Sequence, residues 1–159
     1  MLKDKIKSRV GLERIVSGLK RRGRRIVFTN GCFDLLHFGH ARYLEQAKRF
    51  GDILIVGVNS DSSVRKIKGK KRPIVKERDR ASLIAALESV DFVTIFSEPT
   101  PLRLIQRLKP DVLIKGADWN KKGIVGEEFV KGRGGRVATV KLERGRSTTG
   151  LIGKIAKTF

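Results

Sequence analysis

The stretch of residues 52–59, Asp-Ile-Leu-Ile-Val-Gly-Val-Asn, is apolar at almost every position between its two polar ends. A strand with one face in water alternates apolar and polar side chains, whereas a strand buried on both faces reads as a continuous apolar run. Strands of the second kind occur almost only in parallel sheets that helices cover on both faces. This run therefore favours a parallel sheet.

Segments with strand character alternate with segments of helical spacing along the rest of the chain. We predict strands over residues 25–30, 52–59, 92–96, 111–114 and 136–140. Helices are predicted over residues 39–50, 77–87, 101–108 and 148–157, and a basic loop precedes the second of them. This order predicts an α/β fold, a Rossmann-like, doubly wound sheet of about five parallel strands with helices on both faces.

The first twenty residues predict an amphipathic helix with Ile6, Val10, Ile15 and Leu19 on one face and an interruption at Gly11. The chain has 159 residues, a length that suits a single domain with one hydrophobic core. We divide it into a basic N-terminal helical segment, residues 1–23, and a domain, residues 24–159.

Charge and composition limit the partners of the chain. The net charge is +20, which attracts anions, yet the basic clusters at residues 20–25 and 66–72 contain no interleaved aromatic side chains. We therefore expect nucleic acid to bind only through non-specific electrostatics. No apolar run approaches the roughly 18 residues of a membrane span, and residues 1–7 are too charged for a signal peptide. The expectation is a cytoplasmic protein without membrane contact, and its single cysteine, Cys32, predicts no internal disulfide.

Ligands of a doubly wound sheet bind outside the carboxyl ends of its strands, so the residues after each strand are the first candidates. Both histidines of the chain, His37 and His40, follow the first strand. A helix that begins near Phe38 places both imidazoles around its first turn, where free amides and the helix dipole attract an anion. Gly39 lets a phosphate approach the backbone closely. The pattern predicts a phosphate site, and the alternative is a pair of structural histidines; no third residue nearby suits a metal.

Two other strand ends carry groups that suit a phosphate. Lys115 follows the strand at residues 111–114 and can either meet a phosphate or stay solvated. At the start of the last predicted helix stand Ser147, Thr148 and Thr149, whose hydroxyls could simply cap that helix. No acidic side chain completes a capping box here, and Arg144 adds charge that a cap does not need. We therefore favour a second anion site at this turn.

Two anion sites at one edge of a sheet predict a ligand with several phosphates, such as a nucleoside triphosphate. The chain contains neither a Gly-x-x-x-x-Gly-Lys-Ser/Thr loop nor a Gly-x-Gly-x-x-Gly turn, which disfavours P-loop and dinucleotide sites. No serine or cysteine is paired with a distant histidine as in a nucleophilic hydrolase. The remaining chemistry is direct displacement at phosphorus, in which a protein positions the reactants and neutralises charge.

Residues 31–40, Gly-Cys-Phe-Asp-Leu-Leu-His-Phe-Gly-His, resemble the His-x-Gly-His signature of the nucleotidylyltransferase superfamily. Residues 58–61, 68–69, 72–73, 115–118 and 145–149 extend this resemblance to the heptose 1-phosphate adenylyltransferase branch. The resemblance implies that residues 24–159 form a nucleotidylyltransferase domain. It further implies transfer of AMP from ATP to a sugar 1-phosphate, D-glycero-β-D-manno-heptose 1-phosphate, with release of pyrophosphate, Mg²⁺ as cofactor and a homodimeric state.

The resemblance also assigns roles to single residues. The catalytic residues that it implies are His37, His40 and Lys115. It implies nucleotide contacts for Gly31, Cys32, Phe33, Gly39, Asp118, Arg144, Ser147, Thr148 and Thr149. The acceptor side is implied for Asp34, Asn59, Lys68 and Arg72, and no side chain is implied as a metal ligand.

Other functions stay open at this point. Glycerol-3-phosphate cytidylyltransferases and FAD synthetases belong to the same superfamily and are the nearest alternatives. The former carry arginine five residues before the serine of their last motif, whereas this chain has Leu142 there, which favours the heptose branch. A basic nucleic-acid-binding module on an inactive transferase fold is the alternative from a different class.

Overall fold

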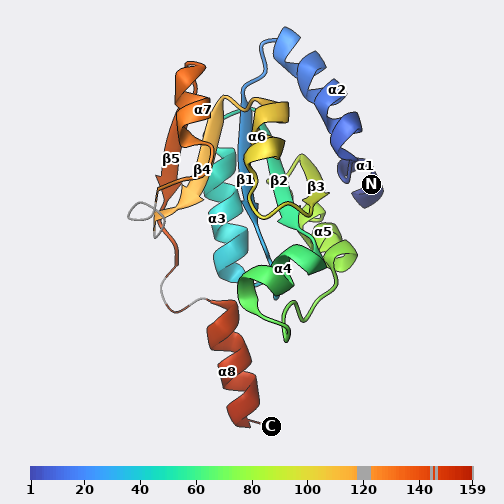
Figure 1. Cartoon of the computed structure of the whole chain (residues 1–159), viewed down its shortest axis with the longest axis vertical. Coiled ribbons are helices and arrows are strands. Elements are labelled where there is room, and N and C mark those ends of the chain that lie inside the picture. The colour runs from blue at the N-terminus through green and yellow to red at the C-terminus, as the bar shows by residue number, and fades with distance from the viewer. Residues whose placement is uncertain (118–122, 144, 146, 159) are drawn as a thin grey trace.

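Figure 1 shows the computed structural model of the chain, in which residues 1–117, 123–143, 145 and 147–158 are described. Its strands are β1 (Ile26–Gly31), β2 (Ile53–Asn59), β3 (Phe92–Phe96), β4 (Val112–Gly116) and β5 (Arg136–Val140). The described strands form one sheet of five in the order β3-β2-β1-β4-β5, and every neighbouring pair is parallel. The predicted Rossmann-like sheet is confirmed, and its strand order reverses between β1 and β4.

The helices of the described chain are α1 (Leu2–Lys5), α2 (Arg9–Arg21), α3 (Phe38–Lys48), α4 (Asp61–Lys68), α5 (Glu77–Ala85), α6 (Leu102–Leu108), α7 (Glu127–Gly132) and α8 (Thr148–Thr158). Of these, α4 occupies part of the stretch that we expected as a basic loop. The expectation was wrong because Ser60 caps this segment, its Oγ accepting from the Ser63 amide, and basic side chains fall in its last turn, where the dipole favours them.

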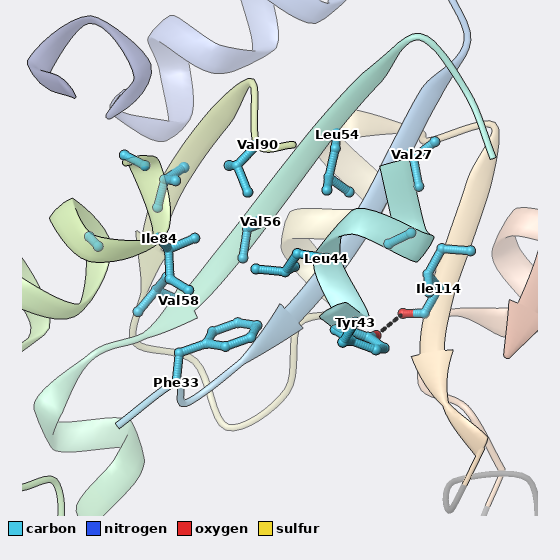
Figure 2. Close-up of a cluster of buried hydrophobic side chains, with 14 of the residues drawn as sticks. Val27, Phe33, Tyr43, Leu44, Leu54, Val56, Val58, Ile84, Val90 and Ile114 are labelled. Carbon is cyan, nitrogen blue, oxygen red and sulfur yellow. Dashed lines mark hydrogen bonds between the residues drawn. The ribbon is translucent and has the colours of Figure 1, made fainter. Parts of the chain in front are cut away.

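The two faces of the sheet bury two separate layers of side chains. Val27, Leu54 and Val56 point to one face and pack against α3 and α5, as Figure 2 shows for this cluster. Their neighbours Phe28 and Ile55 point to the other face, which α2, α6 and α7 cover. Because β1, β2 and β4 have apolar side chains on both sides, they lie between these layers, as the continuous apolar run of residues 52–59 predicted.

The predicted N-terminal helix differs from the observed one in its start and in its buried face. α2 begins after Ser8, whose Oγ accepts from the Gly11 amide, and it continues through Gly11 without interruption. The buried positions are Leu12 and Val16, which join the same core layer as Phe28, whereas Val10 is 54% exposed. Ile6 lies before the helix and forms a bridge to β3. The boundary between residues 23 and 24 remains a prediction.

The last helix, α8, leads away from the body of the domain (Figure 1). None of its described residues is buried. The helical prediction for residues 148–157 is confirmed, but this helix covers neither face of the sheet. Its first turn nevertheless lies at the carboxyl edge of the sheet, where the candidate site is found.

Candidate active site

A cavity of about 620 Å³ opens at the carboxyl ends of the strands, next to the point where the strand order reverses. Every predicted site residue that the structure describes lines it: Gly31, Cys32, Phe33, Asp34, His37, Gly39, His40, Asn59, Lys68, Arg72, Lys115, Ser147, Thr148 and Thr149. The two remaining predicted residues, Asp118 and Arg144, lie outside the described residues. Segments as distant as residues 31 and 149 thus meet at one edge of the sheet.

The loop between β1 and α3 carries local strain at this cavity. Phe33 has φ of 47°, a left-handed conformation that is rare for a bulky residue and costs about 1–3 kcal/mol. The conformation turns the Phe33 ring into the core layer, where it is buried. A Cβ atom at position 31 would lie 3.0 Å from this ring, so Gly31 leaves room for it. The strained turn aims the following residues, including the histidines, at the cavity.

The two imidazoles stack on one another at the start of α3, where His37 is the N-cap residue. Their ring centroids are 3.9 Å apart with an interplanar angle of 20°. Desolvation, and then the neighbouring His37, lower the pKa of His40 from 6.5 to about 4, so this ring is neutral at pH 7. The buried Nδ1 of His40 has no hydrogen-bond partner among the described residues. A hydrogen bond with the Leu35 backbone partly opposes this shift of the His40 pKa, and a neutral imidazole has a single N–H donor.

A buried lysine stands beside the histidines at the end of β4. Lys115 donates a hydrogen bond to Oδ1 of Asn30, at the end of the neighbouring strand β1. The pattern of the sequence identified Lys115 but missed Asn30, although the same strand-end rule covers both. This hydrogen bond holds the ammonium group at the wall of the cavity that the imidazoles also line, where it adds positive charge.

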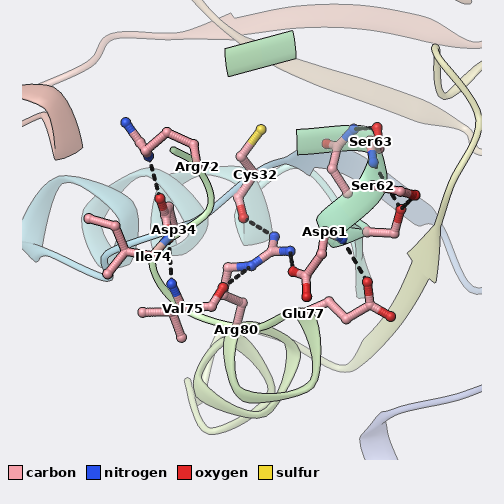
Figure 3. Close-up of polar contacts among 12 residues, drawn as sticks. Cys32, Asp34, Asp61, Ser62, Ser63, Arg72, Ile74, Val75, Glu77 and Arg80 are labelled. Atoms are coloured by element: carbon pink, nitrogen blue, oxygen red, sulfur yellow. Dashed lines mark hydrogen bonds and ion pairs between the residues drawn. The ribbon is translucent and has the colours of Figure 1, made fainter. Parts of the chain in front are cut away.

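Part of the cavity wall comes from Lys68, at the end of α4, and from Arg72, in the loop of residues 69–76 that follows it. Asp34, which is buried, accepts from Arg72 Nε at 2.5 Å and from the amides of Ile74 and Val75 at 2.8 and 2.9 Å (Figure 3). The carboxylate therefore holds the loop, and the far end of the Arg72 guanidinium is left for the cavity. The Lys68 side chain is exposed at the same rim.

Asn59 and Ser147 have structural partners as well as positions in the cavity wall. Asn59 donates from Nδ2 to Ser63 Oγ at 2.9 Å, at the start of α4. Ser147 Oγ accepts from the Gly150 amide at 3.0 Å, so it caps α8. The hydroxyl of Thr148 donates to the Leu35 carbonyl at 3.5 Å, which links this turn to the loop before the histidines. Capping and a position at the cavity coexist here.

Several lining residues were not predicted as site residues from the sequence, although Leu142 had distinguished between branches of the superfamily. The apolar part of the wall comes from Ile67, Val125 and Leu142, and the turn at residues 99–101 closes one side. Tyr43 reaches the cavity from α3, and its hydroxyl lies 2.7 Å from that of Thr29. Apolar walls with a few cationic groups suit a ligand that has both a ring system and an anionic part.

Lys68, Arg72 and Lys115 are the cationic side chains of this cavity. Of its two carboxylates, Asp34 is held by Arg72 and two amides, and Glu143 has its Oε1 4.0 Å from Arg42 Nε. The described residues contain no group of three side chains that could hold a metal ion. The geometry can bind a ligand with several phosphates and can stabilise charge that develops on them.

In the described residues, no helix is long and apolar enough to cross a membrane.

The sequence and the fold of this chain match a known class of proteins. The model of the cytidylyltransferase-like family matches residues 28–143, and the chain belongs to this family. It is 54% identical over 155 residues to the bifunctional protein HldE of Geobacter metallireducens, an alignment that covers 98% of the chain and 32% of the relative. HldE of Helicobacter pylori is 52% identical over 92% of the chain. The chain thus spans about a third of the length of these relatives.

Two solved structures extend the comparison. A lipopolysaccharide core biosynthesis protein from Thermoplasma volcanium superposes with a TM-score of 0.62 and 32% identity, over 76% of this chain and 98% of that chain. A pantoate-beta-alanine ligase from Francisella tularensis superposes with a TM-score of 0.66 over 87% of this chain and 67% of that chain. Its identity of 18% shows a shared fold alone.

Proposed function

We propose that the chain transfers AMP from ATP to D-glycero-β-D-manno-heptose 1-phosphate, giving ADP-heptose and pyrophosphate. The family membership and the likeness to HldE over 98% of the chain support a nucleotidylyltransferase. The observation that carries the proposal is that the stacked histidines and the Ser-Thr-Thr turn line one cavity. One triphosphate chain can therefore contact both.

The reaction is a displacement at the α-phosphorus of ATP. An oxygen of the acceptor phosphate forms a bond to this phosphorus, and the bond from the α-phosphorus to the bridging oxygen breaks. The electron pair of that bond leaves with pyrophosphate. A phosphate monoester is already ionised near neutral pH, so no proton has to be removed from the nucleophile. Catalysis then rests on positioning and on charge stabilisation.

The neutral state of His40 suits this chemistry. An imidazole with a pKa of about 4 is a poor general base at pH 7, but its N–H can donate to a phosphate oxygen. We assign His37, His40 and Lys115 to the charge that develops between the α- and β-phosphates. Gly31, Cys32, Phe33 and Gly39 bring the backbone close to the nucleotide, and the turn at residues 147–149 holds the β- and γ-phosphates.

The part of the cavity that Lys68 and Arg72 line is assigned to the acceptor. Lys68 and Arg72 supply positive charge for the sugar phosphate, and Asp34 orients Arg72. Asn59, which lines the same cavity, is assigned to the acceptor as well. Mg²⁺ arrives with ATP as part of the substrate. Mg²⁺ in nucleotide sites is commonly held by substrate phosphates and few carboxylates, and both oxygens of Asp34 are already engaged.

The experiment that tests the proposal is pyrophosphate release from the full chain with ATP or CTP. Heptose 1-phosphate, glycerol 3-phosphate and FMN serve as acceptors. The proposal expects release with ATP and heptose 1-phosphate at least about tenfold above every other pair. Release that is fastest with CTP and glycerol 3-phosphate, or with ATP and FMN, identifies one of the alternative transferases and contradicts it.

We also propose that the chain forms a homodimer, and α8 supports this. Leu151 and Ile155 are one turn apart on this helix, and they are 37% and 54% exposed. An apolar helix face that covers nothing in its own chain is suited to burial against a second copy. The same helix carries residues 147–149 at its start, so its placement affects the phosphate turn.

A further inference from the structure

Arg80 is a fully buried arginine in α5 that no step of the proposed reaction uses. Its side chain is 0% exposed, which is unusual for a charged residue, and it lies behind the cavity rather than in its wall. A buried guanidinium is retained only where its donors are satisfied, so its partners show what it holds together.

Three segments meet at this guanidinium, as Figure 3 shows. Nη1 donates to the Cys32 carbonyl at 2.5 Å, in the loop that carries the histidines. Nε donates to the Val75 carbonyl at 2.8 Å, in the loop of residues 69–76. Nη2 pairs with Asp61 Oδ1 at 2.8 Å, at the start of α4. Arg80 thus links the loop between β1 and α3, the loop of residues 69–76 and the start of α4.

Asp61 and Glu77 close this arrangement from the other side. The amide of Asp61 donates to Glu77 Oε2 at 2.6 Å, while the Asp61 carboxylate accepts from Arg80. The first residue of α4 is therefore hydrogen-bonded to α5 twice, through its amide and through its carboxylate. The loop of residues 69–76 connects the end of α4 to the start of α5. The hydrogen bonds between the two helix starts therefore restrain both ends of the segment that carries Lys68 and Arg72.

We propose that Arg80 is a positioning residue for the acceptor phosphate, acting through the loop of residues 69–76. Asp34 holds this loop at Arg72 and at two amides, and Arg80 holds it at the Val75 carbonyl. The loop between β1 and α3 has further anchors of its own, since Phe33 is buried in the core. Loss of Arg80 therefore loosens the acceptor side more than the nucleotide side. This inference rests on the proposed function.

The test compares Arg80→Met with the matched control Arg78→Met in the full chain. Arg78 lies in the same helix, and its side chain is exposed. Pyrophosphate release is measured with ATP and heptose 1-phosphate, each varied in turn. We expect Arg80→Met to raise the KM for the acceptor about tenfold or more, with the KM for ATP within about threefold of wild type. The control keeps both values.

Two further variants keep the inference testable if Arg80→Met does not fold. Arg80→Lys retains the charge but not the three-way fork, and Asp61→Asn retains an acceptor oxygen without its charge. Both are expected to shift the acceptor KM in the same direction, by less than Arg80→Met. Equal increases in both KM values, or no change in any of the three variants, overturn the inference.

A second measurement separates this inference from the proposed function. If wild type releases no pyrophosphate, the proposed function fails, and hydrogen exchange of the ligand-free protein decides on the positioning role. The amides of Ile74 and Val75 are expected to exchange at least about tenfold faster in Arg80→Lys than in wild type, while amides of β2 keep their rates. Unchanged exchange at these two amides rules out the role of Arg80.

Discussion

His40 has a pKa of about 4 because desolvation, and then the adjacent His37, disfavour its charged form. The unfolded chain takes up this proton near pH 6.5, whereas the folded protein takes it up only near pH 4. Below pH 6.5 the unfolded state therefore binds more protons than the folded state. As the pH is lowered from about 6.5 to about 4, the free energy of unfolding decreases. His40→Asn is expected to lose less stability than wild type between about pH 7 and about pH 5 in urea titrations. Parallel curves for the two proteins would contradict the depressed pKa.

The catalytic assignment of the same pair leads to a second prediction. His37→Ala and His40→Ala each remove a donor aimed at charge that develops during transfer, so kcat is expected to fall at least about 100-fold. Pyrophosphate release measures the loss, and circular dichroism checks that the fold is kept. Ser62→Ala, a change at an exposed hydroxyl outside the cavity wall, is the control. Turnover near the wild-type value in both histidine variants would remove the assignment.

Helix α2 buries a different face from the one that the spacing of its apolar residues in the sequence predicts. Leu12 is 0% exposed, while Val10, two residues earlier, points to solvent. Leu12→Ala leaves a cavity between α2 and α6 and is expected to cost about 2–5 kcal/mol of unfolding free energy. Val10→Ala is expected to change it by less than about 0.5 kcal/mol. Urea unfolding of both variants tests this register, and a larger loss for Val10→Ala would show that the other face is buried.

Among the elements that the sequence predicted correctly are two strands that residue type alone identifies. β3 and β5 have the expected bounds, because short runs of branched and aromatic residues are typical of strands at any position. α7 was not predicted, since its six residues bury a single side chain, Val130, and show no period. The sequence predicts an interruption at Gly11, but the helix starts at the Ser8 cap and continues through this glycine.

Some residues of the candidate site were predicted from the sequence and others were not. His37 and Lys115 follow directly from the rule that ligands bind at strand ends. Asn30 also stands at a strand end, but its hydrogen bond with Lys115, like those of Arg80 with Cys32 and Asp61, joins residues far apart along the chain. A linear pattern contains no such pairings. They depend on the crossing from β1 to β4 and on the packing of α5 under the β1–α3 loop.

At the scale of the whole molecule, the net charge of +20 opposes the homodimer that α8 supports. Two protomers repel one another at low salt, whereas burial of Leu151 and Ile155 favours association at any salt concentration. Because screening shortens the range of repulsion to about 10 Å at 0.1 M salt, the dimer fraction is expected to rise between about 0.05 and about 0.5 M. Light scattering after size exclusion measures it.

The helix face is separated from the charge effect by neutral substitutions. Leu151→Gln combined with Ile155→Gln removes apolar surface without altering charge, so the dimer is expected to dissociate at least about tenfold more readily at every salt concentration. Lys157→Gln lies on the same helix, leaves the apolar face intact and lowers the repulsion, so it is expected to dimerise slightly better than wild type. A monomer at high salt in wild type, or a glutamine double variant that dimerises like wild type, would show that α8 does not join two copies.

Because residues 147–149 begin this helix, a dimer that fixes α8 is also expected to lower the KM for ATP as protein concentration rises.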